Sequence, residues 1–208
     1  MSQASKFFRT VSSKSKKILI RVLPMSLKNR LKQYRRVREV LTIIGQPQYS
    51  GIDPELSITD LDRLSLMKNK YAGERIFIVG NGPSLNNTDL DQLDDEYIFC
   101  MNRVSLLFER VRWRPQFFTA FDLRVVPDNL DEFNSLDIPY KFFATKHKGA
   151  INEQENHFWY HDRSSADDFS NRFSGDPAIT GFGGGGTVSC VAIQIASYMG
   201  FDPIVLIG

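Results

Sequence analysis

The chain has 208 residues, of which 42% are hydrophobic and 24% charged, proportions typical of a globular protein with one domain of ordinary size. The two cysteines, Cys100 and Cys190, lie in apolar runs, so we expect buried thiols in a reducing compartment rather than a disulfide or a metal pair. The first 38 residues hold 12 of the 26 Lys and Arg residues and none of the 24 acids, so this stretch carries +12 and the remainder −10. Such asymmetry indicates a basic segment with its own partner, and the acidic remainder argues against nucleic-acid binding.

Residues 1–45 form the predicted basic segment. Its apolar run over 18–23 is interrupted by Arg21 and stops at Pro24, which is too short for a transmembrane helix and unlike a signal peptide. Over 25–44, apolar residues recur at steps of three and four opposite a basic face, and Gly45 is placed to cap the helix. We expect this helix to contact an anionic membrane surface or a partner, in a cytoplasmic protein peripheral to the inner membrane. The alternative is a helix packed on its own domain with a solvated basic face.

Residues 46–70 are predicted to be a linker and a short helix, in which Leu61, Leu64 and Met67 make an apolar stripe. Residues 71–208 then alternate between strand and helix patterns. The predicted strands are 75–80, 97–102, 117–121, 140–144 and 204–207, and the predicted helices 88–93 (with Thr88 as N-cap), 104–111, 129–136 and 187–199. Residues 152–174 have no clear periodicity and are interpreted as an irregular excursion over the site. The alternation of predicted strands and helices over residues 71–208 predicts an α/β, Rossmann-like fold with a mostly parallel, doubly wound sheet. Because the sequence stops directly after its last strand, we expect it to be a truncated one.

The first of these strands ends abruptly at Gly80-Asn81-Gly82-Pro83-Ser84. In an open α/β sheet, ligands bind beyond the carboxyl ends of the strands, and glycines allow the backbone to approach a phosphate or sugar closely. A tight turn without a ligand is the alternative. The loop lacks the third glycine of the dinucleotide fingerprint and the Lys-Ser/Thr of a P-loop.

Other polar residues follow the later strands in the same way. Asn102 ends the second strand, Asp122 the third, and four glycines (183–186) precede the helix that begins at Thr187. Such groups converge on one crevice in this architecture. Asp122 is also a possible helix cap.

Together, the residues 80–85, the strand ending at Asn102, the strand from 114 to 122, Gly185-Gly186-Thr187-Val188 and the ending 198–208 resemble the 6-hydroxymethylpterin diphosphokinase MptE-like family. They are also similar to bacterial sialyltransferases that use CMP-sialic acid. The resemblance covers about residues 70–208 and implies a Rossmann-like nucleotide-binding fold. It implies that Asn81 and Asn102 hold the nucleotide, with Gly80, Gly82, Pro83, Ser84, Gly185, Gly186 and Thr187 around it, and that Asp122 is a candidate ligand for Mg²⁺ and a candidate catalytic residue.

The reaction stays open between several classes. The family name implies a transferase that moves diphosphate from ATP to a pterin-like acceptor. The alternative is a sialyltransferase-like glycosyltransferase that uses a CMP-sugar in cell-surface glycan synthesis, and a second alternative is a non-catalytic binding or scaffold protein. In both enzyme groups an acidic residue and further catalytic segments, with a histidine base in the sialyltransferases, normally follow the strand that ends here at Gly208.

Three histidines complete the candidates. His157 and His161 lie four residues apart and would share a face of a helix as a metal pair, although their aromatic surroundings suit a strand equally well. His147, between two lysines, is interpreted as a solvated loop residue.

Overall fold

The computed structural model describes residues 57–163, 177–183 and 187–208. The basic segment 1–45, most of the predicted linker, Gly185 and Gly186 lie outside the described residues. The predicted membrane contact of residues 1–45 therefore stays a prediction. The division of the chain into segments 46–70 and 71–208 also stays a prediction. Within the described ranges, no helix has both the length and the apolar character needed to cross a bilayer.

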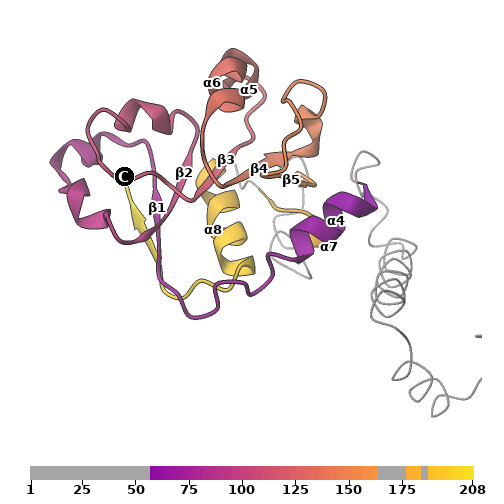
Figure 1. Cartoon of the computed structure of the whole chain (residues 1–208), viewed down its shortest axis with the longest axis horizontal. Helices are drawn as coiled ribbons and strands as arrows, with labels where there is room; N and C mark the ends of the chain where they lie inside the picture. Colours follow the sequence, from indigo (N-terminus) through magenta and orange to yellow (C-terminus); the bar gives the residue numbers. More distant parts are fainter. Residues whose placement is uncertain (1–56, 164–176, 184–186) are drawn as a thin grey trace, which may run out of the picture. The chain divides into compact units, whose positions relative to one another are not determined.

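Six strands form one sheet in the spatial order β5-β4-β3-β2-β1-β6 (Figure 1). All neighbouring strands are parallel. The inner strands are buried on both faces, which is why they read as continuous apolar runs rather than as alternating patterns. The predicted α/β fold with a parallel sheet is confirmed. The strands are β1 (Ile76–Val79), β2 (Tyr97–Met101), β3 (Phe117–Ala120), β4 (Tyr140–Ala144), β5 (His157–Tyr160) and β6 (Ile204–Ile207).

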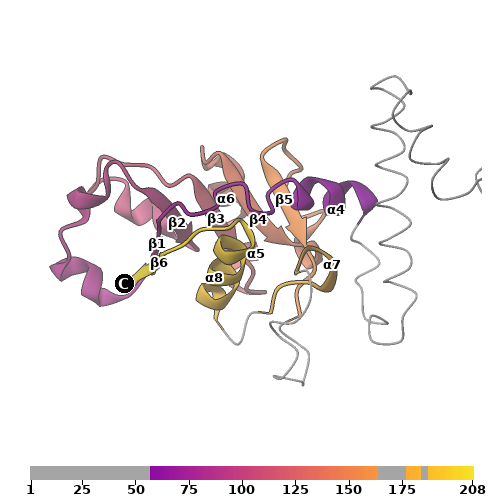
Figure 2. The ribbon, with the colours of Figure 1, turned by 90° about the horizontal axis from the view of Figure 1, so that it is seen from below.

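Helices cover the two faces of this sheet (Figures 1 and 2). On one face, α8 (Val188–Tyr198) packs against β1, β2, β3 and β6. On the other face lie α5 (Val125–Asp128) and α6 (Leu130–Ser135), where Phe133 packs against Phe118 of β3 with ring centroids 5.3 Å apart. Successive side chains of a strand point to opposite faces, so the neighbour Phe117 faces α8.

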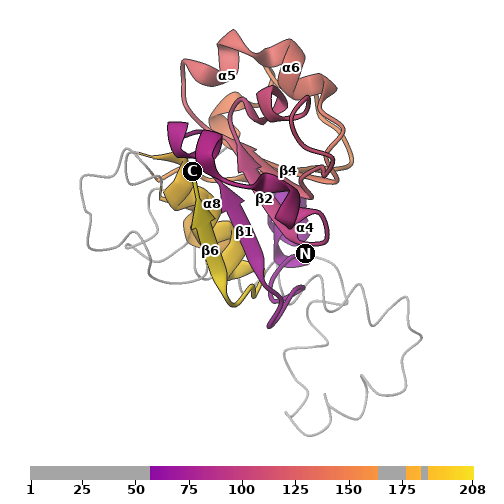
Figure 3. The same ribbon diagram turned by 90° about the vertical axis from the view of Figure 1, so that its left-hand side faces the viewer.

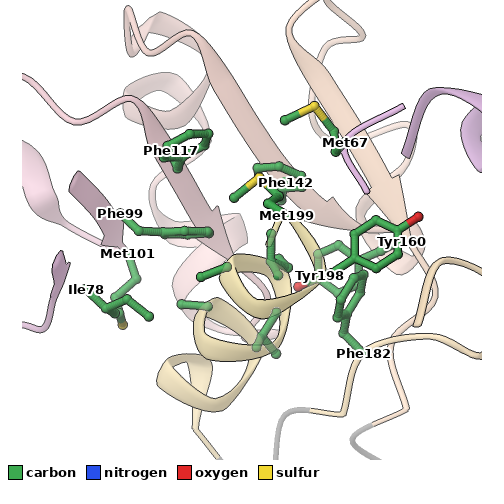
Figure 4. Close-up of a cluster of buried hydrophobic side chains, with 14 of the residues drawn as sticks. Met67, Ile78, Phe99, Met101, Phe117, Phe142, Tyr160, Phe182, Tyr198 and Met199 are labelled. Atoms are coloured by element: carbon green, nitrogen blue, oxygen red, sulfur yellow. The ribbon is translucent and has the colours of Figure 1, made fainter. Parts of the chain in front are cut away.

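The larger part of the core lies between α8 and the sheet (Figure 4). Phe99 of β2 stacks between Phe117 and Phe142, with ring centroids 5.9 and 6.0 Å apart, and Tyr160 meets Phe182 edge-on. Burying each such side chain contributes about 1.5–3 kcal/mol to folding. This packing fixes α8 against the sheet and so fixes where its first turn lies.

The helix α4 (Ile58–Ser65) packs against β5 and against α7 (Pro177–Thr180). Ser57 and Asp60 form a reciprocal capping box, and the Lys148 ammonium lies 2.6 Å from the Asp60 carboxylate. The predicted apolar stripe is confirmed, because Leu61, Leu64 and Met67 are all buried.

Several predicted elements need correction. The segment interpreted as an irregular excursion contains β5, which is an edge strand of the six-stranded sheet. The helix predicted over 104–111 is only the 3₁₀ helix η4 (Val104–Leu107). The helix η3 (Leu90–Leu93) is also of the 3₁₀ type, and its N-cap is Asp89 rather than Thr88, because the Asp89 carboxylate accepts from the Asp91 N–H.

The helix predicted over 129–136 is present as α6, with Asn129 as its N-cap, and a second short helix that was not predicted, α5, directly precedes it. The Asn129 side chain donates to the Val125 carbonyl oxygen at 2.7 Å and so competes with the helical main chain.

Both cysteines are free thiols as expected. Cys100 is buried, which raises the pKa of its thiol, but Cys190 is only half-buried.

Candidate functional site

The direction of chain progression changes at β1. From β1 the chain proceeds through β2, β3, β4 and β5 toward one edge of the sheet, whereas β6 lies on the other side of β1. Figure 3 shows β1 and β6 side by side. Ligands of open α/β folds bind beyond the carboxyl ends of the strands at such a switch point, so the loop after β1 occupies the position expected for a binding loop.

Three glycines bring the carboxyl ends of β1 and β6 together. The Gly80 N–H donates to the Ile207 oxygen at 2.8 Å. A Cβ atom on Gly82 would lie 2.7 Å from the carbonyl carbon of Gly208, and one on Gly208, whose φ is +122°, would lie 2.9 Å from Gly80. At Gly82 and Gly208, only a residue without a side chain fits this approach. The 3₁₀ helix η2 (Pro83–Asn87) follows with Gly82 as its N-cap, and Asn81, Pro83 and Ser84 are exposed.

Asn81 joins this loop to the end of β2. Its side-chain amide donates to the Met101 carbonyl oxygen at 3.0 Å. One N–H of the Nδ2 group is therefore used within the protein, and its second N–H and the Oδ1 atom are the parts of Asn81 that can serve a ligand.

Asn102 follows β2 directly and has an unusual backbone. Its φ is +51°, the left-handed region that residues with a side chain rarely adopt. Its N–H donates to the Thr119 oxygen of β3, whereas its Oδ1 atom is buried and has no hydrogen-bond partner among the residues that the structure describes. A buried acceptor without a partner is costly, and strained residues cluster at ligand sites. Asn102 is thus the described residue that points most directly to a ligand.

The amino terminus of α8 lies beside the end of β2. Thr187 caps the helix through its hydroxyl, which accepts from the Ser189 N–H at 3.3 Å. The Ser189 Oγ atom lies 3.5 Å from the sulfur of Met101, the residue before Asn102. The first turn of an eleven-residue helix, with its free N–H groups, therefore lies next to the Asn102 position.

Asp122, two residues beyond β3, accepts main-chain N–H groups at the start of α5, whose N-cap position is Arg124. Its Oδ1 atom accepts from the Val125 and Arg124 N–H groups at 3.0 and 2.7 Å. These two hydrogen bonds stabilise the charged form and hold the pKa of the carboxyl below its usual value. The sequence suggests either a helix cap or a ligand for Mg²⁺ at Asp122. The hydrogen bonds of the described residues correspond to the capping role.

Charged and buried groups occupy the ends of β4 and β5. The Lys146 ammonium lies 2.5 Å from the Asp162 carboxylate and 4.9 Å from the centre of the Phe121 ring. The interpretation of His147 as a solvated residue is wrong, because its side chain is 3% exposed and its Nε2 lies 2.8 Å from the Phe121 oxygen. Burial lowers the pKa of His147, so the ring is neutral and Nε2–H donates. This bond fixes the peptide group before Asp122.

A family model described as 6-hydroxymethylpterin diphosphokinase MptE-like matches residues 53–208. The chain belongs to this family. No curated protein matches it, and the chain is similar to the structure of MAf glycosyltransferase from Magnetospirillum magneticum AMB-1 with 18% identity and a TM-score of 0.43. That likeness covers 71% of this chain and 26% of the other, so the chain spans about a quarter of that structure's length.

In this MptE-like chain the sequence-predicted residues divide into two groups. Gly80, Asn81, Gly82, Asn102 and Thr187 lie at the adjoining ends of β1, β6, β2 and α8, whereas Asp122 belongs to the end of β3 with Lys146 and His147. No signal in the sequence marks His147, since a histidine between two lysines in a polar loop looks exposed.

The histidines predicted as a possible metal pair do not share a helix. His157 lies within β5, and His161 follows that strand. Among the described ranges, no group of three or more His, Cys, Asp or Glu side chains is placed to hold a metal ion.

Mg²⁺ needs only one or two carboxylates when substrate phosphates and waters supply its other ligands. With Oδ1 of Asp122 used in capping, Oδ2 is the atom that would hold Mg²⁺.

Proposed function

We propose that this chain is a nucleotide-dependent transferase, and that its nucleotide binds beyond the carboxyl ends of β1, β6 and β2. The observation that supports this most is the strained Asn102 with its buried, unpartnered Oδ1 atom, beside the glycine loop of a switch point. The family description favours transfer of diphosphate from ATP to a pterin-like acceptor.

The hydrogen-bonding chemistry of Asn102 indicates which part of the nucleotide it would contact. An amide oxygen accepts hydrogen bonds, and phosphate oxygens at neutral pH accept them too, so the Asn102 Oδ1 atom pairs with a hydroxyl or amino group of the nucleoside. The phosphates then lie against the N–H groups that follow Gly80 and at the amino terminus of α8, where the helix dipole favours negative charge.

For diphosphate transfer, Asp122 Oδ2 would hold Mg²⁺, which when bound neutralises charge on the phosphates. The described side chains have supporting roles. His147 holds the peptide group before Asp122, and the two N–H bonds to Oδ1 keep the carboxyl ionised. Lys146 lies at the end of β4, where its ion pair with Asp162 at 2.5 Å leaves little net positive charge for the phosphates.

One observation favours the alternative, a glycosyltransferase that uses a CMP-sugar. Residues 80–85 contain no charged side chain. A donor with a single phosphate needs less neutralisation at this loop than a triphosphate does. The acceptor would then be a glycan, and the basic segment 1–45 would hold the enzyme at the inner membrane surface.

Calorimetric titration of the full chain with ATP, CTP and CMP, each with and without Mg²⁺, tests the proposal. Magnesium-dependent binding of ATP supports diphosphate transfer, and selective binding of CMP and CTP supports glycosyl transfer. If none of the three binds to folded protein, the nucleotide site is refuted and the scaffold alternative stands.

A further inference from the structure

Arg103 follows Asn102 directly and so lies at the carboxyl end of β2. Its side chain is 54% exposed, and its Nε atom lies 3.7 Å from the Oε2 atom of Glu132 in α6. The other carboxylate oxygen of Glu132, Oε1, accepts a hydrogen bond from the Ser105 hydroxyl. Among the residues that the structure describes, the Arg103 guanidinium donates no hydrogen bond. Glu132 therefore orients this guanidinium through its Nε edge and leaves both Nη groups available for a ligand.

The positive charge of Arg103 is less neutralised than that of Lys146, which follows β4. The Lys146 ammonium is in close contact with the Asp162 carboxylate at 2.5 Å, and the attraction between two charges weakens with distance. The loop after β1 offers no cation itself, because residues 80–85 contain no charged side chain. Arg103 is thus the cation that adjoins the strained Asn102.

The ion pair with Glu132 also sets the side of the sheet on which the guanidinium lies. The helix α6 packs on the face of the sheet opposite α8, so Arg103 and the first turn of α8 lie on opposite sides of the end of β2. A phosphate at the amino terminus of α8 is bound by main-chain N–H groups on one side. Phosphates that continue from it across the end of β2 meet the guanidinium on the other.

We propose that Arg103 binds the outer phosphates of the donor nucleotide, and that Glu132 is a positioning residue that holds the Arg103 side chain in place for them. The planar guanidinium donates two parallel hydrogen bonds to phosphate oxygens, which a Lys ammonium cannot do. A side chain that is already oriented loses less conformational entropy on binding. This inference rests on the proposed function, because it takes the first phosphate to lie at the amino terminus of α8.

Two variants of the full chain and one matched control test the assignment of Arg103. Arg103→Gln removes the positive charge, and Arg103→Lys keeps the charge but loses the paired donors. The control is Arg112→Gln, which makes the same change of charge at another exposed arginine between β2 and β3, close to the amino end of β3. Because both arginines are exposed, we expect every variant to keep a Tm close to that of the wild type.

The measurement is the Kd, by calorimetry in magnesium, of a triphosphate and of the corresponding monophosphate: ATP with AMP, and CTP with CMP. For the base that the wild type binds, Arg103→Gln should weaken triphosphate binding about tenfold, because a hydrogen bond between charged groups is lost. It should change monophosphate binding less than twofold. Arg103→Lys should lie between Arg103→Gln and the wild type, and Arg112→Gln should bind like the wild type.

The outcomes separate this inference from the proposed function. If Arg103→Gln weakens triphosphate and monophosphate equally, or weakens neither, the inference is overturned while the proposed function stands. The same conclusion follows if Arg112→Gln weakens the triphosphate as much as Arg103→Gln does. If the wild type binds none of the four nucleotides, both fall.

A double-mutant cycle tests the positioning role of Glu132. Glu132→Gln keeps an acceptor for the Ser105 hydroxyl and removes the charge beside Arg103. If Glu132 acts through Arg103, this change weakens triphosphate binding severalfold in the wild type and has no further effect in the Arg103→Gln background. Unchanged or tighter binding in Glu132→Gln, or equal losses in the two backgrounds, would exclude the positioning role.

Discussion

The side-chain amide of Asn81 donates to the main-chain oxygen of Met101 at 3.0 Å and so links the loop after β1 to the end of β2. Met101 precedes Asn102, whose left-handed backbone is therefore fixed from both neighbouring strands, by Asn81 and by the Thr119 oxygen. The two asparagines that the sequence marks are parts of one arrangement. Asn81 orients the turn, and Asn102 presents its oxygen.

Replacing Asn102 with Gly separates backbone strain from ligand binding. Gly adopts a positive φ without a penalty, so we expect the free energy of unfolding to change by less than about 1 kcal/mol. Loss of Oδ1 should weaken nucleotide binding about tenfold. Asn69→Gly is the matched control, because Asn69 also has a left-handed backbone (φ +54°), but its N–H donates to the oxygen of Tyr198, the last residue of α8. Equal affinity in both variants would remove Asn102 from the site.

Gly82→Ala tests the close approach of the β1 and β6 ends. The added Cβ atom would lie 2.7 Å from Gly208, so the loop has to shift, and we expect a loss of about 1–3 kcal/mol in unfolding free energy. At Gly80 the nearest atom to a Cβ is 3.4 Å away, an ordinary contact, so Gly80→Ala should cost less. Denaturant unfolding compares the two. An equal cost at both positions would contradict this geometry.

Variants of Asp122 distinguish capping from metal binding. Asp122→Asn keeps the acceptor for the Arg124 and Val125 N–H groups and should leave the Tm close to that of the wild type, whereas Asp122→Ala should lose about 1 kcal/mol. If Oδ2 also holds Mg²⁺, both variants weaken ATP binding in magnesium and neither does so in EDTA. Wild-type ATP affinity that is independent of Mg²⁺ would exclude the metal role.

His157 makes the stability of the fold depend on pH. Its ring is fully buried, and burial together with Lys141 and Arg63 lowers its pKa to about 4, from an ordinary value of 6.5. The unfolded chain takes up a proton at higher pH than the folded chain does, so stability is complete above pH 6.5 and decreases as pH falls toward 4. The expected loss is roughly 3 kcal/mol at pH 4. His157→Phe should show a smaller decrease in urea midpoint between pH 7 and 4.5; an unchanged pH dependence would assign the effect to other groups.

The basic segment 1–45 is expected to bind anionic membranes. Full-length protein should sediment with vesicles that contain phosphatidylserine and remain in the supernatant with neutral vesicles, and 0.5 M salt should release it, because surface charges are screened at high ionic strength. Replacing Lys28, Lys32 and Arg36 with Gln should reduce the bound fraction. Retention by neutral vesicles would indicate a different mode of contact.

The sequence by itself determined the parallel α/β fold, the strands 140–144 and 204–207, and the glycine-rich loop after β1. These follow from local information, since both strands are short and mostly apolar and a glycine-rich break ends β1. It missed β5, because a short aromatic strand has no period that distinguishes it from a loop until β4 provides its hydrogen-bond partner.

Only the tertiary structure decided which polar residues act together. Asn102 looked like one strand-end polar residue among several, and its strained backbone and unpartnered oxygen appear only when β1, β3 and α8 surround it. His147 carries no local signal at all. Its role depends on a contact with Phe121, 26 residues away in the chain. Hydrogen bonds over such separations are set by packing, which no pattern in the sequence encodes directly.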